Sequence, residues 1–140
     1  MKALTLTQPW ATLVAVGAKR IETRSWYTNQ RGRIAIHAAK GFPLQARDIC
    51  QEKPFRDVLH ALGLTLFDLP LGAVIATAEL WRILRIDYMV SALLPPPEPE
   101  RSYGDYAPLR YAWYLRDVWA IEPVPCKGHL GLWEWGGTPE

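Results

Sequence analysis

The chain has 140 residues, of which 49% are apolar and 21% charged, a composition that fits one folded domain over residues 1–140 and excludes a disordered chain. No run of about 18 apolar residues occurs, which excludes a transmembrane helix in this sequence, and residues 1–10 lack the apolar stretch of a signal peptide. The two cysteines, Cys50 and Cys126, form no CxxC pair, so we expect free thiols in a reducing cytoplasm.

The first elements are predicted to be a strand and a helix. Residues 3–7 (ALTLT) alternate between the two faces of an extended chain, which predicts a short strand. The next residues have an apolar face with helical spacing from Trp10 to Gly17. We expect Thr7 to be the N-cap of this helix and Gly17 to end it, because glycine readily adopts the left-handed conformation.

Two strands and two short helices are expected next, all before residue 65. The alternating segment 19–26 and the segment 33–37 (RIAIH) are predicted to be strands. Residues 44–62 have a helical pattern that Pro54 interrupts, so we expect two short helices rather than one long one.

Strands dominate the second half of the chain. Segments 73–86 and 111–121 are predicted to be long strands that are central and neighbouring in the sheet. Residues 124–126 and 131–135 are expected to be short closing strands. The proline-rich segment 94–99 cannot form regular structure and is expected to be a stiff, exposed loop.

This order of elements favours one architecture. Short strands with few helices do not make a regular βαβ array. We therefore predict an α+β protein, a small mixed β-barrel with helices packed on its outside and at its ends. A closed barrel would leave no exposed sheet edge.

The positive charge is concentrated in one segment. Residues 19–40 contain six basic residues and one acidic residue, a net charge of +5, while the rest of the chain carries 10 basic and 13 acidic residues. Such asymmetry is typical of an anion-facing surface, and equally compatible with a solvated basic edge that binds nothing.

The segment GAKRIETR, residues 17–24, places a lysine, a glutamate and an arginine directly behind the first helix. In a strand, Glu22 and Arg24 share one face and Lys19 lies on the other. Two interpretations are open. The charges form an exposed ion pair that contributes little, or the two cations hold a phosphate or carbonyl oxygen while Glu22 fixes their geometry.

These residues resemble the ASCH domain family of the PUA-like superfamily. Its GxKxxExR signature is complete here as Gly17, Lys19, Glu22 and Arg24. The segments QPWA, IHAAK, LPLGAVIATAEL, YAWYL and PVPCKGHLGLW are also similar to the family, so the resemblance covers nearly the whole chain.

The resemblance implies a PUA-like β-barrel with flanking helices and a motif that lines a cleft. It also implies binding of RNA or a modified nucleoside in that cleft, with no cofactor. For the motif to share one surface, Lys19 must lie in the turn before the strand, and we expect that it does. Glu22 could then hold the two cations, accept a proton, or bind the exocyclic amine of a base.

Aromatic residues and one further arginine are candidates for ligand binding. Trp10 and Trp26 flank the motif, and either could stack on a base, although burial in the core is the alternative for both. The loop of residues 102–113 could fold over the cleft, and Arg110 is its best candidate for a ligand contact.

No metal site is predicted. His37 ends an apolar strand, where a hydrogen-bonded structural role is the better interpretation than a catalytic one, and the cysteines and histidines do not have zinc-ligand spacing.

The main functional alternative is a metal-independent hydrolase. In amidohydrolase relatives that act on acylated cytidine, the resemblance implies catalysis by a Lys, a Thr and a Glu. Lys19 matches the lysine and Glu22 replaces the threonine, while no motif places the glutamate, for which Glu79 and Glu100 are suggested. A ribonuclease would use Lys19 and Arg24 to stabilise charge and Glu22 or a tyrosine to move a proton.

Overall fold

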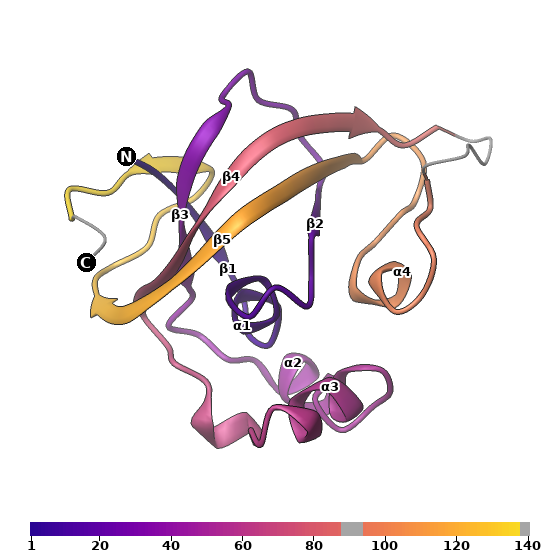
Figure 1. Cartoon of the computed structure of the whole chain (residues 1–140), viewed down its shortest axis with the longest axis vertical. Coiled ribbons are helices and arrows are strands. Elements are labelled where there is room, and N and C mark those ends of the chain that lie inside the picture. The colour runs from indigo at the N-terminus through magenta and orange to yellow at the C-terminus, as the bar shows by residue number, and fades with distance from the viewer. Residues whose placement is uncertain (88–93, 138–140) are drawn as a thin grey trace.

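The computed structural model describes residues 1–87 and 94–137 and contains one mixed sheet with helices on one side (Figure 1). The strands are β1 (Lys2–Leu6), β2 (Ile21–Arg24), β3 (Gly32–Ala38), β4 (Ala73–Arg85), β5 (Tyr111–Pro125) and β6 (Leu132–Glu134). The helices are α1 (Trp10–Ala15), α2 (Leu44–Ile49), α3 (Phe55–Ala61), α4 (Glu100–Tyr103) and a 3₁₀ turn at Leu66–Asp68. None of the described helices has the length and apolar character needed to cross a bilayer.

The strand order is β2-β5-β4-β3-β1-β6. Only β1 and β3 pair in parallel, and the other neighbours are antiparallel. As predicted, β4 and β5 are long, central and adjacent. Their register shifts at three points, and such bulges increase the local twist and curvature of a sheet. The result is a curved half-barrel with an α+β fold.

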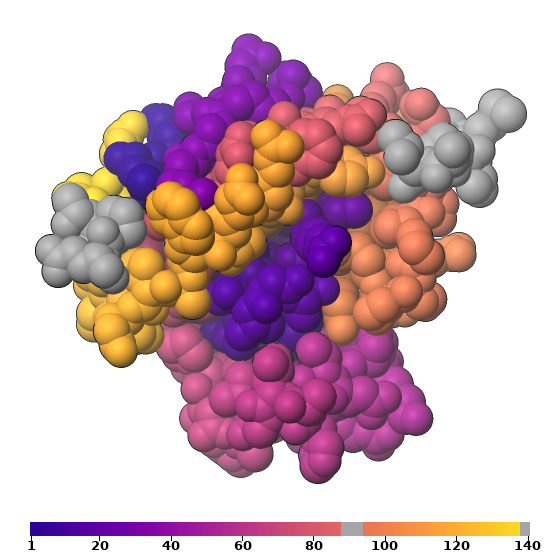
Figure 2. Space-filling view, viewed as in Figure 1, coloured from indigo at the N-terminus to yellow at the C-terminus, as the bar shows by residue number. Residues whose placement is uncertain are grey.

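Helix α1 packs against the curved sheet and supplies part of its core. Its buried residues, Ala11 and Val14 among them, join apolar side chains of β1, β3, β4 and β5 in one cluster. Figure 2 shows α1 in indigo between the orange β5 and the magenta α2–α3 layer. Burial of this apolar face, rather than intrinsic propensity, stabilises a helix of six residues.

The predicted mixed barrel is confirmed as a half-barrel, but it is not closed. The sheet is open, with β2 and β6 as its edges in the described part of the chain. The loop after α4 covers edge strand β2, since the backbone N–H of Asp105 donates to Thr23 Oγ1 at 3.0 Å. Closing the barrel would require long-range pairing that alternation along the sequence does not encode, and the edge is protected by a loop instead.

Three local predictions also need correction. Thr7 does not cap α1; the side chain of Gln8 accepts the Thr12 N–H at 2.9 Å instead. The predicted strand at 124–126 largely belongs to the end of β5, which runs further than its apolar stretch suggested. The 94–99 segment is only partly exposed, because Leu94 and Pro96 are buried.

Candidate functional site

The turn after α1 places Lys19 ahead of strand β2. Gly17 has a φ of +79°, the left-handed conformation that favours glycine, and therefore ends the helix as predicted. The Lys19 N–H then donates to the Leu13 carbonyl at 3.0 Å, so this residue stays in the turn. The Lys19 side chain can consequently reach the face of β2 that carries Glu22 and Arg24.

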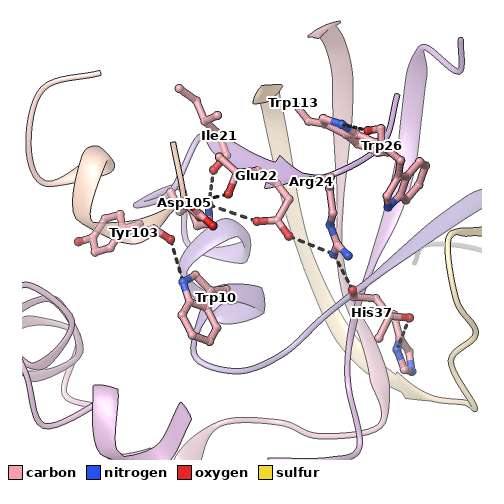
Figure 3. Close-up of polar contacts among 12 residues, drawn as sticks. Trp10, Ile21, Glu22, Arg24, Trp26, His37, Tyr103, Asp105 and Trp113 are labelled. Atoms are coloured by element: carbon pink, nitrogen blue, oxygen red, sulfur yellow. Dashed lines mark hydrogen bonds and ion pairs between the residues drawn. The ribbon is translucent and has the colours of Figure 1, made fainter. Parts of the chain in front are cut away.

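The three charged residues of the motif form one ion network. Glu22 Oε1 lies 3.3 Å from Lys19 Nζ, and Glu22 Oε2 lies 3.0 Å from Arg24 Nη2. Lys19 Nζ also donates to the Ile21 carbonyl. Arg24 Nη2 donates to the Thr5 carbonyl of β1 at 2.8 Å, which ties edge strand β2 to β1 across the opening of the sheet (Figure 3).

A cavity of about 530 Å³ lies beside this network, and we call it the motif cleft. Glu22, Arg24 and the loop after α4 form part of its wall, together with Thr5, Thr7, Trp10, Thr23, Ser25, Trp26, Ile49, Ser102, Tyr103, Gly104, Asp105 and Arg110. Two acidic and two basic side chains line it, so the motif cleft is close to charge-balanced. The expected surplus of positive charge is not found in its walls.

Lys19 does not face the motif cleft. Its side chain is 0% exposed and lies behind Glu22, which is itself 12% exposed. The expectation that its ammonium group meets a ligand directly does not agree with this position. Lysine is seldom fully buried without a partner, and Glu22 is that partner here.

Arg24 is the motif cation that remains available. Its side chain is 25% exposed. Its Nη2 is held by Glu22 and Thr5, and its Nε is buried without a hydrogen-bond partner among the described residues. Its Nη1 makes no hydrogen bond to a described residue, so a guanidinium fixed at Nη2 can offer Nη1 to an oxygen acceptor.

Both candidate tryptophans border the motif cleft. The Trp10 Nε1–H donates to the Tyr103 carbonyl at 2.8 Å, and its ring meets Phe55 edge-on. Trp26 packs edge-on against the buried Trp113, with ring centroids 4.7 Å apart. Each indole is partly buried, so each side chain both packs against the core and borders the motif cleft (Figure 3).

The loop after α4 folds over the motif cleft and contributes Arg110. The Arg110 guanidinium donates to the Thr23 carbonyl at 3.3 Å and to the Asp105 carbonyl at 3.1 Å, and it pairs with the Asp105 carboxylate at 3.5 Å. Thr5, Thr23 and Asp105 were not among the residues predicted from the sequence. Thr5 and Thr23 act through both their carbonyls and their hydroxyls, and contacts to a backbone carbonyl leave no side-chain pattern in the sequence.

Of the two distal glutamates, Glu100 lies near the motif and Glu79 does not. Glu79 forms a two-point contact with Arg116, which holds the pKa of its carboxyl below the ordinary value. Glu100 Oε1 accepts the Arg20 N–H at 2.5 Å. Burial raises the pKa of the Glu100 carboxyl, although the Arg20 N–H and the Lys19 charge act in the opposite direction.

Replacing Glu100 with glutamine is expected to change how stability depends on pH. A raised pKa means that the Glu100 carboxyl contributes stability below its ordinary pKa and loses it as the pH rises through the raised value. Glu100→Gln should therefore have a higher free energy of unfolding than the wild type at pH 7 and an equal one below about pH 4. Urea unfolding across this range measures the effect. The exposed Glu122→Gln should change nothing, and a loss of stability in Glu100→Gln at pH 7 would refute the burial argument.

His37 has the hydrogen bonds of a structural residue. It is 1% exposed, with Nδ1 3.2 Å from Thr5 Oγ1 and Nε2 2.9 Å from the Cys126 carbonyl. Trp133 Nε1–H also donates to Thr5 Oγ1, at 3.0 Å. Within residues 1–87 and 94–137, no three His, Cys, Asp or Glu side chains are grouped so that they could hold a metal ion.

Comparison with known proteins agrees with this fold. The chain matches the ASCH domain model over residues 4–125. It is 52% identical over 132 residues to Activating signal cointegrator 1 of Homo sapiens, a match that covers 94% of this chain and 22% of that protein. A second match, to Activating signal cointegrator 1 of Mus musculus, is 57% identical over 35 residues, 25% of this chain and 6% of that protein. The chain thus spans at most about a fifth of these relatives.

Among solved structures, the chain resembles ASCH from Zymomonas mobilis. The TM-score is 0.50 at 19% sequence identity, and the match covers 89% of this chain and 72% of that one. A likeness at this identity shows the fold, a half-barrel sheet of PUA-like type. Together with the family model, which spans most of the sequence, it establishes that the chain belongs to the ASCH domain family, a PUA-like family associated with RNA binding.

Proposed function

We propose that the motif cleft binds single-stranded RNA, or a modified nucleoside within it. The observation that carries the proposal is the Arg24 guanidinium, held at Nη2 with Nη1 uncommitted and 25% of the side chain exposed, in a cavity that two indole rings also border. Arginine offers a planar donor fork to phosphate or carbonyl oxygens, and an indole offers a stacking surface to any base.

Each proposed site residue has a distinct role. Arg24 and Arg110 contact the ligand oxygens, and Trp26 and Trp10 present the stacking surface. Glu22 fixes Arg24 and faces the cleft, where it can accept the exocyclic amine of a base. Lys19 is a positioning residue, because it touches Glu22 and lies behind the cleft.

Two groups that could transfer a proton, the Glu22 carboxylate and the Tyr103 hydroxyl, are poorly suited to do so, which favours binding over hydrolysis. Both carboxylate oxygens of Glu22 already face cations, so this group is poorly placed to take a proton from a nucleophile. Burial, and then the Glu100 charge, raise the pKa of the Tyr103 hydroxyl, which makes it a weak acid. The hydrolase, either a ribonuclease or an amidohydrolase, is therefore the alternative that the test must exclude.

We also propose that residues 1–140 act as one domain in a reducing cytoplasm. The free thiols of Cys50 and Cys126 support this location, because disulfides form mainly in oxidising compartments.

Arg24→Ala is expected to weaken binding of a single-stranded oligouridylate hexamer about tenfold or more, the value of one charge-assisted contact. Arg24→Lys should also weaken binding but keep the wild-type salt dependence, because it retains the charge and loses the fork. Fluorescence anisotropy with a labelled hexamer at several salt concentrations measures both. The exposed Arg56→Ala, on α3, is the matched control.

Two outcomes would overturn the proposed function. One is a wild-type protein that does not bind the hexamer at any salt concentration. The other is cleavage of the hexamer or deacylation of N4-acetylcytidine that Glu22→Gln abolishes, which would establish the hydrolase instead.

A further inference from the structure

A second cavity, of about 770 Å³, adjoins the motif cleft. Its walls include two lysines and two histidines, Lys40, Lys127, His37 and His129, and we call it the lysine cavity. Thr5 lines both cavities and therefore lies at the wall between them.

The surplus of positive charge near the motif lies in this second cavity. Lys40 and Lys127 are exposed, and the structure gives neither of them an ion pair within residues 1–87 and 94–137. No Asp or Glu lines the lysine cavity, whereas Glu22 and Asp105 offset the arginines of the motif cleft. Two uncompensated ammonium groups favour an anion with more than one charge.

The wall between the cavities is fixed by hydrogen bonds. Thr5 Oγ1 lies between Trp133 Nε1 and His37 Nδ1, and the Thr5 carbonyl accepts from Arg24. Thr5 thus contacts the arginine of the first cavity through its carbonyl and the histidine of the second through its hydroxyl.

The residues before and after Lys127 in the sequence, Cys126 and Gly128, pack against this wall. The Cys126 carbonyl faces His37 Nε2 at 2.9 Å. A Cβ at Gly128 would lie 2.6 Å from His37 Cε1 and 2.8 Å from Thr5 Oγ1, so only glycine allows the loop to pack this closely. The backbone on both sides of Lys127 is therefore placed against His37.

We propose that the lysine cavity binds the phosphate backbone of the nucleotides adjacent to the one in the motif cleft. The inference rests on the proposed function and makes it more specific: the ligand is a single strand of two or more nucleotides rather than a free nucleoside. The motif cleft supplies indole rings and a balanced polar wall for a base, and the lysine cavity supplies point charges for phosphates.

The test compares Lys40→Ala/Lys127→Ala with the wild type, using the oligouridylate hexamer and free uridine as probes. Loss of two phosphate contacts should lower the slope of log affinity against log salt by about 1.4 in magnitude. Uridine affinity should stay unchanged, since a nucleoside carries no phosphate. The control Lys53→Ala/Arg56→Ala removes two exposed charges from the α2–α3 region and should leave the slope unchanged.

The outcomes separate this inference from the proposed function. If the double variant keeps the wild-type slope while Arg24→Ala still weakens binding, the lysine cavity is not a backbone subsite and the motif cleft alone binds RNA. Equal wild-type affinity for uridine and the hexamer would also overturn the inference. A hexamer that does not bind to the wild type would overturn both.

Discussion

Replacing Glu22 with alanine is expected to lower the free energy of unfolding by about 3–5 kcal/mol, the cost of leaving a buried charge without its partner. Lys19 Nζ has no exposed surface, and the Glu22 carboxylate is its ion-pair partner at 3.3 Å. The substitution leaves the ammonium group with the Ile21 carbonyl as its remaining close contact in the described structure. Urea unfolding at pH 7 measures the loss.

Two variants control for the effect of losing the Glu22 side chain. Lys19→Met/Glu22→Gln removes both charges and should recover most of the stability, because an uncharged pair of similar volume carries no ionic desolvation penalty. Glu52→Ala removes an exposed carboxylate and should have little effect. A loss below about 1 kcal/mol in Glu22→Ala would show that Lys19 does not depend on this carboxylate.

Replacing Trp113 with alanine is expected to cost about 3–5 kcal/mol, as for other fully buried aromatic side chains. Trp113 is 0% exposed and is the largest fully buried side chain of the described core. Its register partner on β2 is Glu22, its ring contacts Trp26, and its Nε1–H donates to the Trp26 carbonyl at 3.3 Å. The same change should therefore weaken hexamer binding by misplacing Trp26.

Trp113→Phe separates packing from the hydrogen bond. Phenylalanine keeps much of the buried ring, so its loss of stability should be clearly smaller than that of alanine, while its lost donor leaves the Trp26 carbonyl without that bond. Thermal unfolding and hexamer anisotropy on both variants measure the two effects. A Trp113→Ala protein with unchanged Tm would refute the assignment of this side chain to the core.

Local chemistry explains which parts of the fold were predictable. Gly17 ends α1 because a positive φ favours glycine, and Pro54 separates α2 from α3 because proline interrupts a helix. Apolar, β-branched stretches predicted β4 and the first part of β5. Whether the sheet closes into a barrel was not predictable in this way. Closure would require pairing between the two edge strands, β2 and β6, which lie far apart in the sequence.

In the site, too, features set by neighbouring residues were predictable, and features set by contacts distant in the sequence were not. Strand alternation alone placed Lys19 opposite Glu22 and Arg24, and the family resemblance led us to expect Lys19 in the turn beside them, where the three side chains do meet. Neither argument predicted that Lys19 would be buried, because its burial depends on where β2 packs. Nor did either indicate Thr5, whose backbone carbonyl holds Arg24 from a strand 19 residues earlier.

A crystal structure of the protein with the oligouridylate hexamer tests the central claim most directly. We predict one base against Trp26 or Trp10 in the motif cleft, with a ligand oxygen at Arg24. Density for the hexamer around the exposed rings of Trp81 and Trp119 instead, with the motif cleft free of nucleotide, would contradict the account.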